Sequence, residues 1–200
     1  MDFNTDKQYE ATSQEEQTTK TKQTWEETFM QAAELFAKRS SCVKRQVGAI
    51  LVKDNRILST GYNGTVPGFL NCCDVFCLRN PETNEIDTDC GAFPVAGGTY
   101  RQITHHEFAE KYEIHAEQNC LAFAAKNGVA TDGCTMYVTT APCVHCAKLI
   151  AAAGIKTVVF KYPYKYSDGV DFLNDKTDVK VYRMLKTSDG WIECEYSDFR

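Results

Sequence analysis

The stretches EIHAEQNCLAFAAKNG (113–128) and CTMYVTTAPCVHCAKLIAAAGIKTVVF (134–160) decide the fold. The first is apolar nearly all round before it ends in Asn127-Gly128, which predicts a buried helix over residues 114–126. The second predicts a strand, a helix and a strand in that order: residues 134–139, 143–153 and 155–160. Strand–helix–strand at this spacing is typical of a βαβ unit, so we expect parallel strands in a sheet that helices cover on its faces.

The residues upstream predict a helix followed by a β-hairpin. Thr24 stands three residues before Glu27, the spacing of a capping box, and apolar residues then recur at helical spacing to about Ser41. Asp54-Asn55 separates two β-rich runs and indicates a hairpin turn. The two hairpin strands and a further predicted edge strand are residues 47–53, 56–62 and 179–185.

The composition predicts one globular domain. The chain has 200 residues, of which 43% are hydrophobic and 24% charged, which is ordinary for a globular protein. Residues 1–24 contain only four apolar side chains, so we expect a flexible polar tail. The single domain then covers residues 25–200 and contains a long, irregular insert at about 63–113, a length typical of functional or pinned segments.

Charge and hydropathy exclude several classes of protein. With 22 basic and 27 acidic residues the net charge is −5, so no global positive field favours nucleic acid. No apolar run approaches the roughly 20 residues that span a bilayer, so we expect no membrane partner. Residues 1–10 have neither a basic start nor an apolar stretch, so we expect no signal peptide and a cytoplasmic location.

Ten cysteines are many for such a chain. They could form a disulfide framework or be ordinary buried thiols, but disulfide frameworks belong to small secreted domains. Metal ligation therefore explains at least some of them better.

Three candidate metal ligands stand at the starts of two predicted helices. Cys143 and Cys146 are spaced i, i+3, so both thiols lie on one face of a first helical turn, with Pro142 as its first residue. The helix N-terminus carries partial positive charge, which favours the thiolate form that binds metal. Together with His115 they make two sulfurs and one imidazole, and an open fourth position is typical of a catalytic zinc.

Glu117 lies two residues after His115 and can stand beside a metal-bound water without being a ligand. Water on such a zinc has a pKa near about 7, and a neighbouring carboxylate can carry its protons. Each part has an ordinary alternative, because CxxC pairs also occur in zinc knuckles and redox sites and a single histidine is often a core residue. HxE on one helix, a strand, and PCxxC on the next helix together strongly indicate a zinc enzyme.

These motifs resemble the zinc-dependent cytidine-deaminase superfamily, and more narrowly its bacteriophage-type deoxycytidylate (dCMP) deaminases. The resemblance runs from about Trp25 to Tyr166 through these segments: VGAILV (47–52), GYNG (61–64), NCCD (71–74), EIHAEQN (113–119), FAAKNG (123–128), MYVT (136–139), PCVHCAK (142–148) and GIK (154–156). It implies a three-layer α/β/α fold around a mixed five-stranded sheet.

The resemblance also implies hydrolytic deamination of dCMP to dUMP and ammonia. A zinc-bound hydroxide would attack C4 of the ring, and Glu117 would carry the protons. The Ala116 N–H would bind O2 of the base, and the Ala141 carbonyl would receive the leaving amine. The ligands of this catalytic Zn²⁺ would be His115, Cys143 and Cys146.

Further substrate contacts are implied around this centre. Asn63 of GYNG would bind the sugar hydroxyl, although Asn-Gly is an ordinary turn signal as well. Lys126 would bind the 5′-phosphate, with Arg45 as the weaker candidate, because phosphate contacts favour Lys and Arg. The ordinary alternative for either cation is a solvated surface charge.

A tyrosine after the 155–160 strand would stack near the base or the phosphate. Tyr164 and Tyr166 compete with Tyr162 for that role, and surface tyrosines in a loop are the plain alternative. Gln118 departs from the family, which has leucine after the HAE motif, and we expect its amide to meet a subunit contact.

Bacteriophage-type relatives carry a second, structural zinc, whose ligands map here onto Cys42, Cys72, His105 and Glu113. A closed four-ligand site would staple the insert at 63–113 to the end of the first helix and to the approach to His115. Other possible ligands stand in the same region: Cys73, Cys77, Cys90 and His106.

The family also implies regulation and self-association. The enzyme would be a homohexamer, activated by dCTP and inhibited by dTTP with Mg²⁺, with the effector site near GYNG and residues 63–75. It would supply dTTP precursor synthesis, in the host cytoplasm if the source is a bacteriophage. Two hypotheses compete: a nucleic-acid deaminase, which would need a basic groove, and a zinc-stabilised interaction module, which has no use for Glu117.

Overall fold

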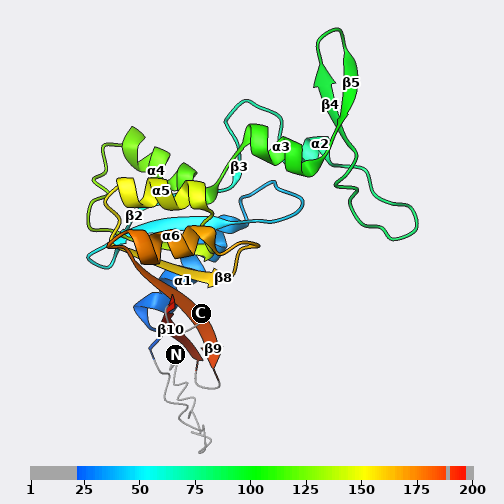
Figure 1. Cartoon of the computed structure of the whole chain (residues 1–200). Helices are drawn as coiled ribbons and strands as arrows, with labels where there is room; N and C mark the ends of the chain where they lie inside the picture. Colours follow the sequence, from blue (N-terminus) through cyan, green and yellow to red (C-terminus); the bar gives the residue numbers. More distant parts are fainter. Residues whose placement is uncertain (1–21, 188–189, 197–200) are drawn as a thin grey trace, which may run out of the picture.

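The body of the protein is a six-stranded sheet with helices on both faces (Figure 1). The computed structural model describes residues 22–187 and 190–196, so the predicted tail at 1–24 falls almost wholly outside the described residues. The elements follow in this order: α1 (Trp25–Ala37), β1 (Gly48–Lys53), β2 (Arg56–Tyr62), β3 (Gly64–Thr65), α2 (Cys72–Val75), β4 (Gly91–Val95), β5 (Thr99–Ile103), α3 (His105–Tyr112), β6 (Glu113–Ile114), α4 (Ala116–Lys126), β7 (Thr135–Thr140), α5 (Val144–Ala152), β8 (Thr157–Tyr162), α6 (Asp168–Lys176), β9 (Lys180–Thr187) and β10 (Gly190–Glu195).

The strand order in the main sheet is β10-β9-β8-β7-β1-β2. Strands β7, β8 and β9 are parallel, whereas β1, β2 and β10 run antiparallel to their neighbours. The predicted mixed sheet and its βαβ unit are therefore confirmed, but the expected five strands become six. The strand predicted at 179–185 is β9 and is not an edge, because β10 pairs along it. The β10 sequence, GWIECE, contains Gly and Glu, which are depleted in strands, and so gave a weak signal.

The alternation of side chains along β1 divides them between two cores. Ala49 and Leu51 pack with α4, α5 and α6, whereas Ile50 and Val52 pack with α1. One helix thus covers one face and three helices cover the other, which confirms the three-layer α/β/α class. None of the helices within residues 22–187 and 190–196 is long and apolar enough to cross a membrane.

The predicted helix start and hairpin turn are found, with different limits. Thr24 and Glu27 form the capping box of α1, which ends at Ala37 rather than near Ser41 because the chain turns tightly there. Asp54 and Asn55 both have positive φ angles, 50° and 56°, as a two-residue hairpin turn requires. The helix predicted to be buried, α4, is buried along one face only, and Phe123 on its other face is 50% exposed.

The insert is more regular than predicted. It contains short elements from β3 to α3, and its β4–β5 hairpin stands apart from the main sheet, with α2 and α3 between them (Figure 1). A small separate core holds the base of this hairpin to α2 and α3, with members that include Phe76, Ile103 and Phe108. The residues that make these contacts are spread through the insert without helical or strand periodicity, so no pattern in the sequence predicted them.

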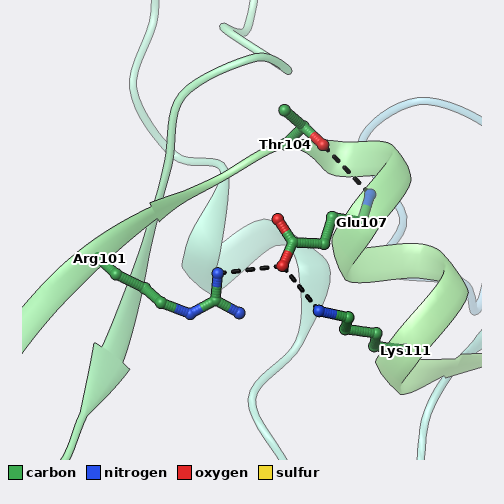
Figure 2. Close-up of polar contacts among 4 residues, drawn as sticks. All are labelled: Arg101, Thr104, Glu107 and Lys111. Atoms are coloured by element: carbon green, nitrogen blue, oxygen red, sulfur yellow. Dashed lines mark hydrogen bonds and ion pairs between the residues drawn. The ribbon is translucent and has the colours of Figure 1, made fainter.

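Polar contacts also tie the hairpin to α3 (Figure 2). Arg101 of β5 and Lys111 of α3 both donate to the Glu107 carboxylate, at 3.1 and 2.9 Å. Thr104 caps α3 by accepting from the Glu107 N–H at 3.2 Å. The bonds from Lys111 and Arg101 lower the pKa of Glu107, because they favour its charged form. The bond from Arg101 therefore joins β5 to α3.

The close approach of β2 to α4 positions the helix that carries Glu117. A Cβ at Gly61 would overlap the backbone O of Ala116 and the backbone N of Cys120, so only glycine allows this contact. Ser59 strengthens it, because its hydroxyl donates to the Cys120 carbonyl at 2.7 Å.

We predict that Gly61→Ala lowers the free energy of unfolding by about 1–3 kcal/mol, because the added methyl group forces α4 away from the sheet. Urea denaturation followed by circular dichroism measures the change. Gly64→Ala is the matched control, since a Cβ there meets nothing within 4 Å, and we expect it to stay within about 0.5 kcal/mol of wild type. Equal stability of the two variants would contradict the packing argument.

Candidate active site

The N-termini of α4 and α5 lie next to each other and bring three metal-binding side chains together. His115 is the N-cap residue of α4 and Cys143 is the N-cap residue of α5, both with extended backbone. Cys146 follows in the first turn of α5. Pro142 therefore precedes the helix instead of being its first residue, because the Cys143 backbone is not helical.

The distances between these side chains suit a zinc ion. The Nδ1 atom of His115 lies 3.5 Å from the Cys143 sulfur and 3.4 Å from the Cys146 sulfur. Two ligands at ordinary Zn–N and Zn–S bond lengths in a tetrahedron are about 3.6 Å apart. One imidazole and two sulfurs at this separation are a donor set that fits Zn²⁺.

The thiols of Cys143 and Cys146 have pKa values shifted in opposite directions. The hydrogen bond from Cys146, followed by that from His115, lowers the pKa of Cys143 to about 3 despite partial burial. The same bond and burial raise the pKa of Cys146. One thiolate is therefore available at neutral pH, and metal binding would displace the second proton.

Glu117 lies beside this donor set but outside it. Its side chain is 4% exposed, and burial raises the pKa of its carboxyl to about 7. Among the described residues, the ligand atoms that gather here come from His115, Cys143 and Cys146, and no carboxylate completes the set. A carboxyl group with a pKa near neutrality can both take up and give back a proton.

A cavity of about 150 Å³ opens onto these groups. An apolar cavity of this size accommodates benzene, so a six-membered ring fits it. The cavity is lined by Cys42, Arg45, Val47, Asn63, His105, Ala109, Glu113, His115, Ala116, Glu117, Thr140, Ala141, Cys143 and Tyr164.

Most of the predicted substrate contacts line this cavity: Asn63, Ala116, Ala141 and Tyr164. Tyr166 and Lys126 are exposed and do not line it. Lys126 ends α4, roughly 13 Å along the helix axis from Glu117. Arg45, ranked second for the phosphate from the sequence, does line it.

The side-chain amide of Asn63 forms hydrogen bonds with the backbone of the segment before β1. Its Oδ1 accepts from the Val47 N–H at 2.8 Å, and its Nδ2 donates to the Arg45 carbonyl at 3.0 Å. The side chain is 8% exposed, so these bonds are shielded from water. Asn63 thus fixes the loop before β1 against the cavity.

A second group of donors borders the same cavity. Cys42, Cys72, His105 and Glu113 place their ligand atoms within 4.8 Å of one another, and the Cys42 sulfur is 3.2 Å from His105 Nε2. Burial raises the pKa of Glu113 to about 7, and its Oε1 is buried without a hydrogen-bond partner. The competing candidates are not members of this group: Cys73, Cys77, Cys90 and His106.

Gln118 has a hydrogen-bond partner inside the chain, and the expected subunit contact stays a prediction. Its Oε1 accepts from the His115 N–H at 2.9 Å, the bond that an N3 residue makes in a capping box. Gln118 therefore fixes the backbone of His115. The spacing of three residues between them was the signal that could have revealed this bond.

The comparison with known proteins agrees with this site. Residues 23–162 match the family described as the cytidine and deoxycytidylate deaminase zinc-binding region. The chain belongs to this family. It is therefore a deaminase, and the donor set at the starts of α4 and α5 lies within the zinc-binding region of the family.

Individual relatives of this deaminase cover most of its length. It is 39% identical over 175 residues to the deoxycytidylate deaminase of Enterobacteria phage T4, an alignment that covers 80% of this chain and 89% of the relative. It is also 39% identical over 145 residues to the deoxycytidylate deaminase of Homo sapiens, covering 72% of this chain and 67% of the relative. A crystal structure of dCMP deaminase from the cyanophage S-TIM5, in complex with dCMP and dUMP, is similar with a TM-score of 0.59 and 34% identity, and covers 79% of this chain and 95% of that one.

We predict that Asn63→Ala destabilises this deaminase by roughly 1–3 kcal/mol, because the Val47 N–H and the Arg45 carbonyl both lose their partner. Chemical denaturation measures the loss. Asn119→Ala is the comparison variant, since the Asn119 amide donates one bond, to the Tyr62 carbonyl at 2.8 Å, and should cost less. A larger loss in Asn119→Ala than in Asn63→Ala would contradict this account.

Proposed function

We propose that this deaminase converts dCMP to dUMP and ammonia by hydrolysis. The observation that carries the proposal is the buried carboxyl of Glu117 beside, and outside, a donor set of one imidazole and two sulfurs. The names of the T4 and S-TIM5 proteins, and the dCMP and dUMP in the S-TIM5 crystal structure, support the choice of substrate.

In the proposed mechanism, the chain's own residues bind the ring and move its protons. A Zn²⁺ ion held by His115, Cys143 and Cys146 would supply Lewis acidity that lowers the pKa of water. Glu117 takes one proton of the attacking water and delivers it to N3 of the ring; it then takes the second proton, from the hydroxyl group added at C4, and delivers it to the amine that departs as the C4–N4 bond breaks. Its pKa of about 7 suits this alternation, because uptake and release cost little at neutral pH.

Backbone groups orient the base in this mechanism. The Ala116 N–H stands in the first turn of α4, where amide groups have no carbonyl partner within the helix, and Ala116 is one of the residues that line the cavity. It therefore suits O2 of the pyrimidine as a hydrogen-bond donor. Ala141 lines the same cavity, and its carbonyl would accept a hydrogen bond from the leaving amine.

The second donor group is proposed to hold a structural Zn²⁺. Two sulfurs, one imidazole and one carboxylate are a closed set of four, and the unpartnered buried Oε1 of Glu113 favours a bound cation. These ligands come from the loop after α1 and from α2, α3 and β6. The ion would therefore pin the insert at 63–113 to the strand that leads into His115.

Regulation and assembly are proposed on the family resemblance alone. The enzyme would supply dUMP for dTTP synthesis, respond to dCTP as activator and to dTTP as inhibitor with Mg²⁺, and act as a homohexamer in the cytoplasm. Activation by dCTP and inhibition by dTTP would make the rate of dUMP production depend on the levels of these two nucleotides.

We predict that the wild-type enzyme converts dCMP in a panel of dCMP, dCTP, deoxycytidine and a cytosine-containing oligonucleotide, and that added dCTP increases the rate. Glu117→Gln should keep its zinc and its fold but lose turnover by at least about 100-fold, because it cannot carry protons. Ammonia release and metal analysis measure both effects.

The control for this panel is Glu110→Gln, which removes an exposed carboxylate of α3 and should leave turnover unchanged. Turnover of Glu117→Gln near the wild-type rate would refute the proton-carrying role. Conversion of the oligonucleotide alone would favour a nucleic-acid deaminase instead.

We predict close to two zinc ions per chain, one from each donor group. Cys72→Ser should lower the zinc content to about one, whereas Cys73→Ser, which changes the exposed neighbouring thiol outside the group, should keep two. Mass spectrometry of the purified proteins measures the metal. A zinc content of one ion per wild-type chain would contradict the proposed structural site and leave the proposed catalytic site in place.

A further inference from the structure

A second close glycine contact lies beside the candidate active site. Gly169, in the first turn of α6, is buried against the backbone that leads into α5. A Cβ at this position would overlap the Pro142 carbonyl oxygen and would stand 2.5 Å from the carbonyl carbon of Cys143. Side-chain carbons essentially never come within 3.0 Å of such atoms, so only glycine allows this approach.

The contact requires glycine for its lack of a side chain and not for its backbone conformation. Gly169 does not belong to the glycines of the described chain that have a positive φ angle. Another residue could therefore adopt the same backbone, and what excludes a side chain is the neighbouring peptide. Val170 and Leu173 hold α6 in this place, because both are buried in the core that α6 shares with α5.

The backbone that Gly169 contacts begins α5 and carries two of the proposed zinc ligands. The Cys143 carbonyl accepts from the Ala147 N–H at 2.9 Å, which is the first hydrogen bond of the helix. Cys146 follows within the same turn, so this bond helps to set the spacing of the two sulfurs. A displacement of the Cys143 backbone would therefore act on both sulfurs.

A side chain at position 169 would displace this backbone further than a zinc site tolerates. Ordinary van der Waals contact begins at 3.4 Å, so relief of the 2.5 Å approach needs about 0.9 Å of movement, the difference between the two distances. Metal–ligand distances in proteins hold to within about 0.2 Å. Even if α6 took up most of the movement, a third of it at Cys143 would exceed this range.

We propose that Gly169 is a positioning residue, which lets α6 pack on the Pro142–Cys143 peptide and thereby holds Cys143 in place as a zinc ligand. This inference rests on the Zn²⁺ ion proposed for the donor set at the starts of α4 and α5. Gly61 has the same relation to the first turn of α4. Each of the two helices that carry the donor set is thus positioned by one glycine from a neighbouring element.

The experiment measures zinc affinity by competition with a coloured chelator, on the zinc-loaded full-length protein. Gly169→Ala should bind the ion of this donor set roughly 10- to 100-fold more weakly, the usual effect of changing a group that orients a metal ligand. Cys143→Ser, which removes a ligand, identifies the zinc ion that belongs to this set. Zinc at the second donor group should keep its wild-type affinity in Gly169→Ala.

Gly48→Ala is the matched control for general destabilisation. A Cβ at Gly48 would overlap the backbone of α1 in the same way, 2.6 Å from the Ala37 nitrogen, and Gly48 has no positive φ angle either. This contact lies on the face of the sheet opposite to α5 and α6. Gly48→Ala should therefore lower the midpoint of urea unfolding by a similar amount and keep zinc affinity within about twofold of wild type. An equal fall in zinc affinity in the two variants would overturn the inference, because zinc would then be lost through general instability.

A second pair of variants decides the question if Gly169→Ala does not fold. Val170→Ala loosens α6 by removing two methyl groups, without adding an atom near Cys143. Val52→Ala makes the same change in the core beneath α1. We expect weaker zinc binding in Val170→Ala alone, and equal zinc affinities in these two variants would overturn the inference.

Failure of the inference is distinguishable from failure of the proposed function. A folded Gly169→Ala protein that holds zinc with wild-type affinity would overturn the inference and leave the proposed catalytic zinc in place. A zinc content that is the same in the wild type and in Cys143→Ser would instead contradict that zinc ion, and with it the proposed mechanism.

Discussion

The side-by-side placement of two helix N-termini is the constraint on which the site depends. His115 and Cys143 are N-cap residues, so their extended backbones place an imidazole and a sulfur at the ends of α4 and α5, where free amide groups and partial positive charge also gather. The glycine contact between β2 and α4 determines how close α4 can come to the sheet. A carboxylate two residues into α4 is then buried by the fold itself, and burial raises its pKa to a useful value.

The first donor set could be predicted from the sequence because each half of it is local. HxE and PCxxC each fix the spacing of their own side chains, and the two motifs stand at the starts of consecutive helices, α4 and α5, with one strand between them. The second set could not, because its ligands are spread from Cys42 to Glu113 over four separate elements, and only the family resemblance proposed them. The helices and strands of the insert were not predicted, for a similar reason. Their small core joins short segments whose apolar residues recur at neither helical nor strand spacing.

The two donor groups are also close in the chain. Glu113 of the second group and His115 of the first are separated by Ile114 alone, and β6 pairs with β3, which begins at Gly64, the last residue of the GYNG segment. The two groups therefore share one short stretch of backbone, β6 and the residue after it. Gln118 accepts from the His115 N–H at the end of this stretch, which explains why an amide is tolerated on the partly buried part of α4.

The family resemblance proposed Lys126 for the phosphate, and the structure places this residue at the end of α4, outside the residues that line the cavity. Arg45 stands in a short loop with no periodicity, and it contacts a buried amide from between β2 and β3 and an aromatic ring from beyond β8. Loop residues of this kind are placed by long-range contacts, so the sequence alone does not predict which of them line a cavity.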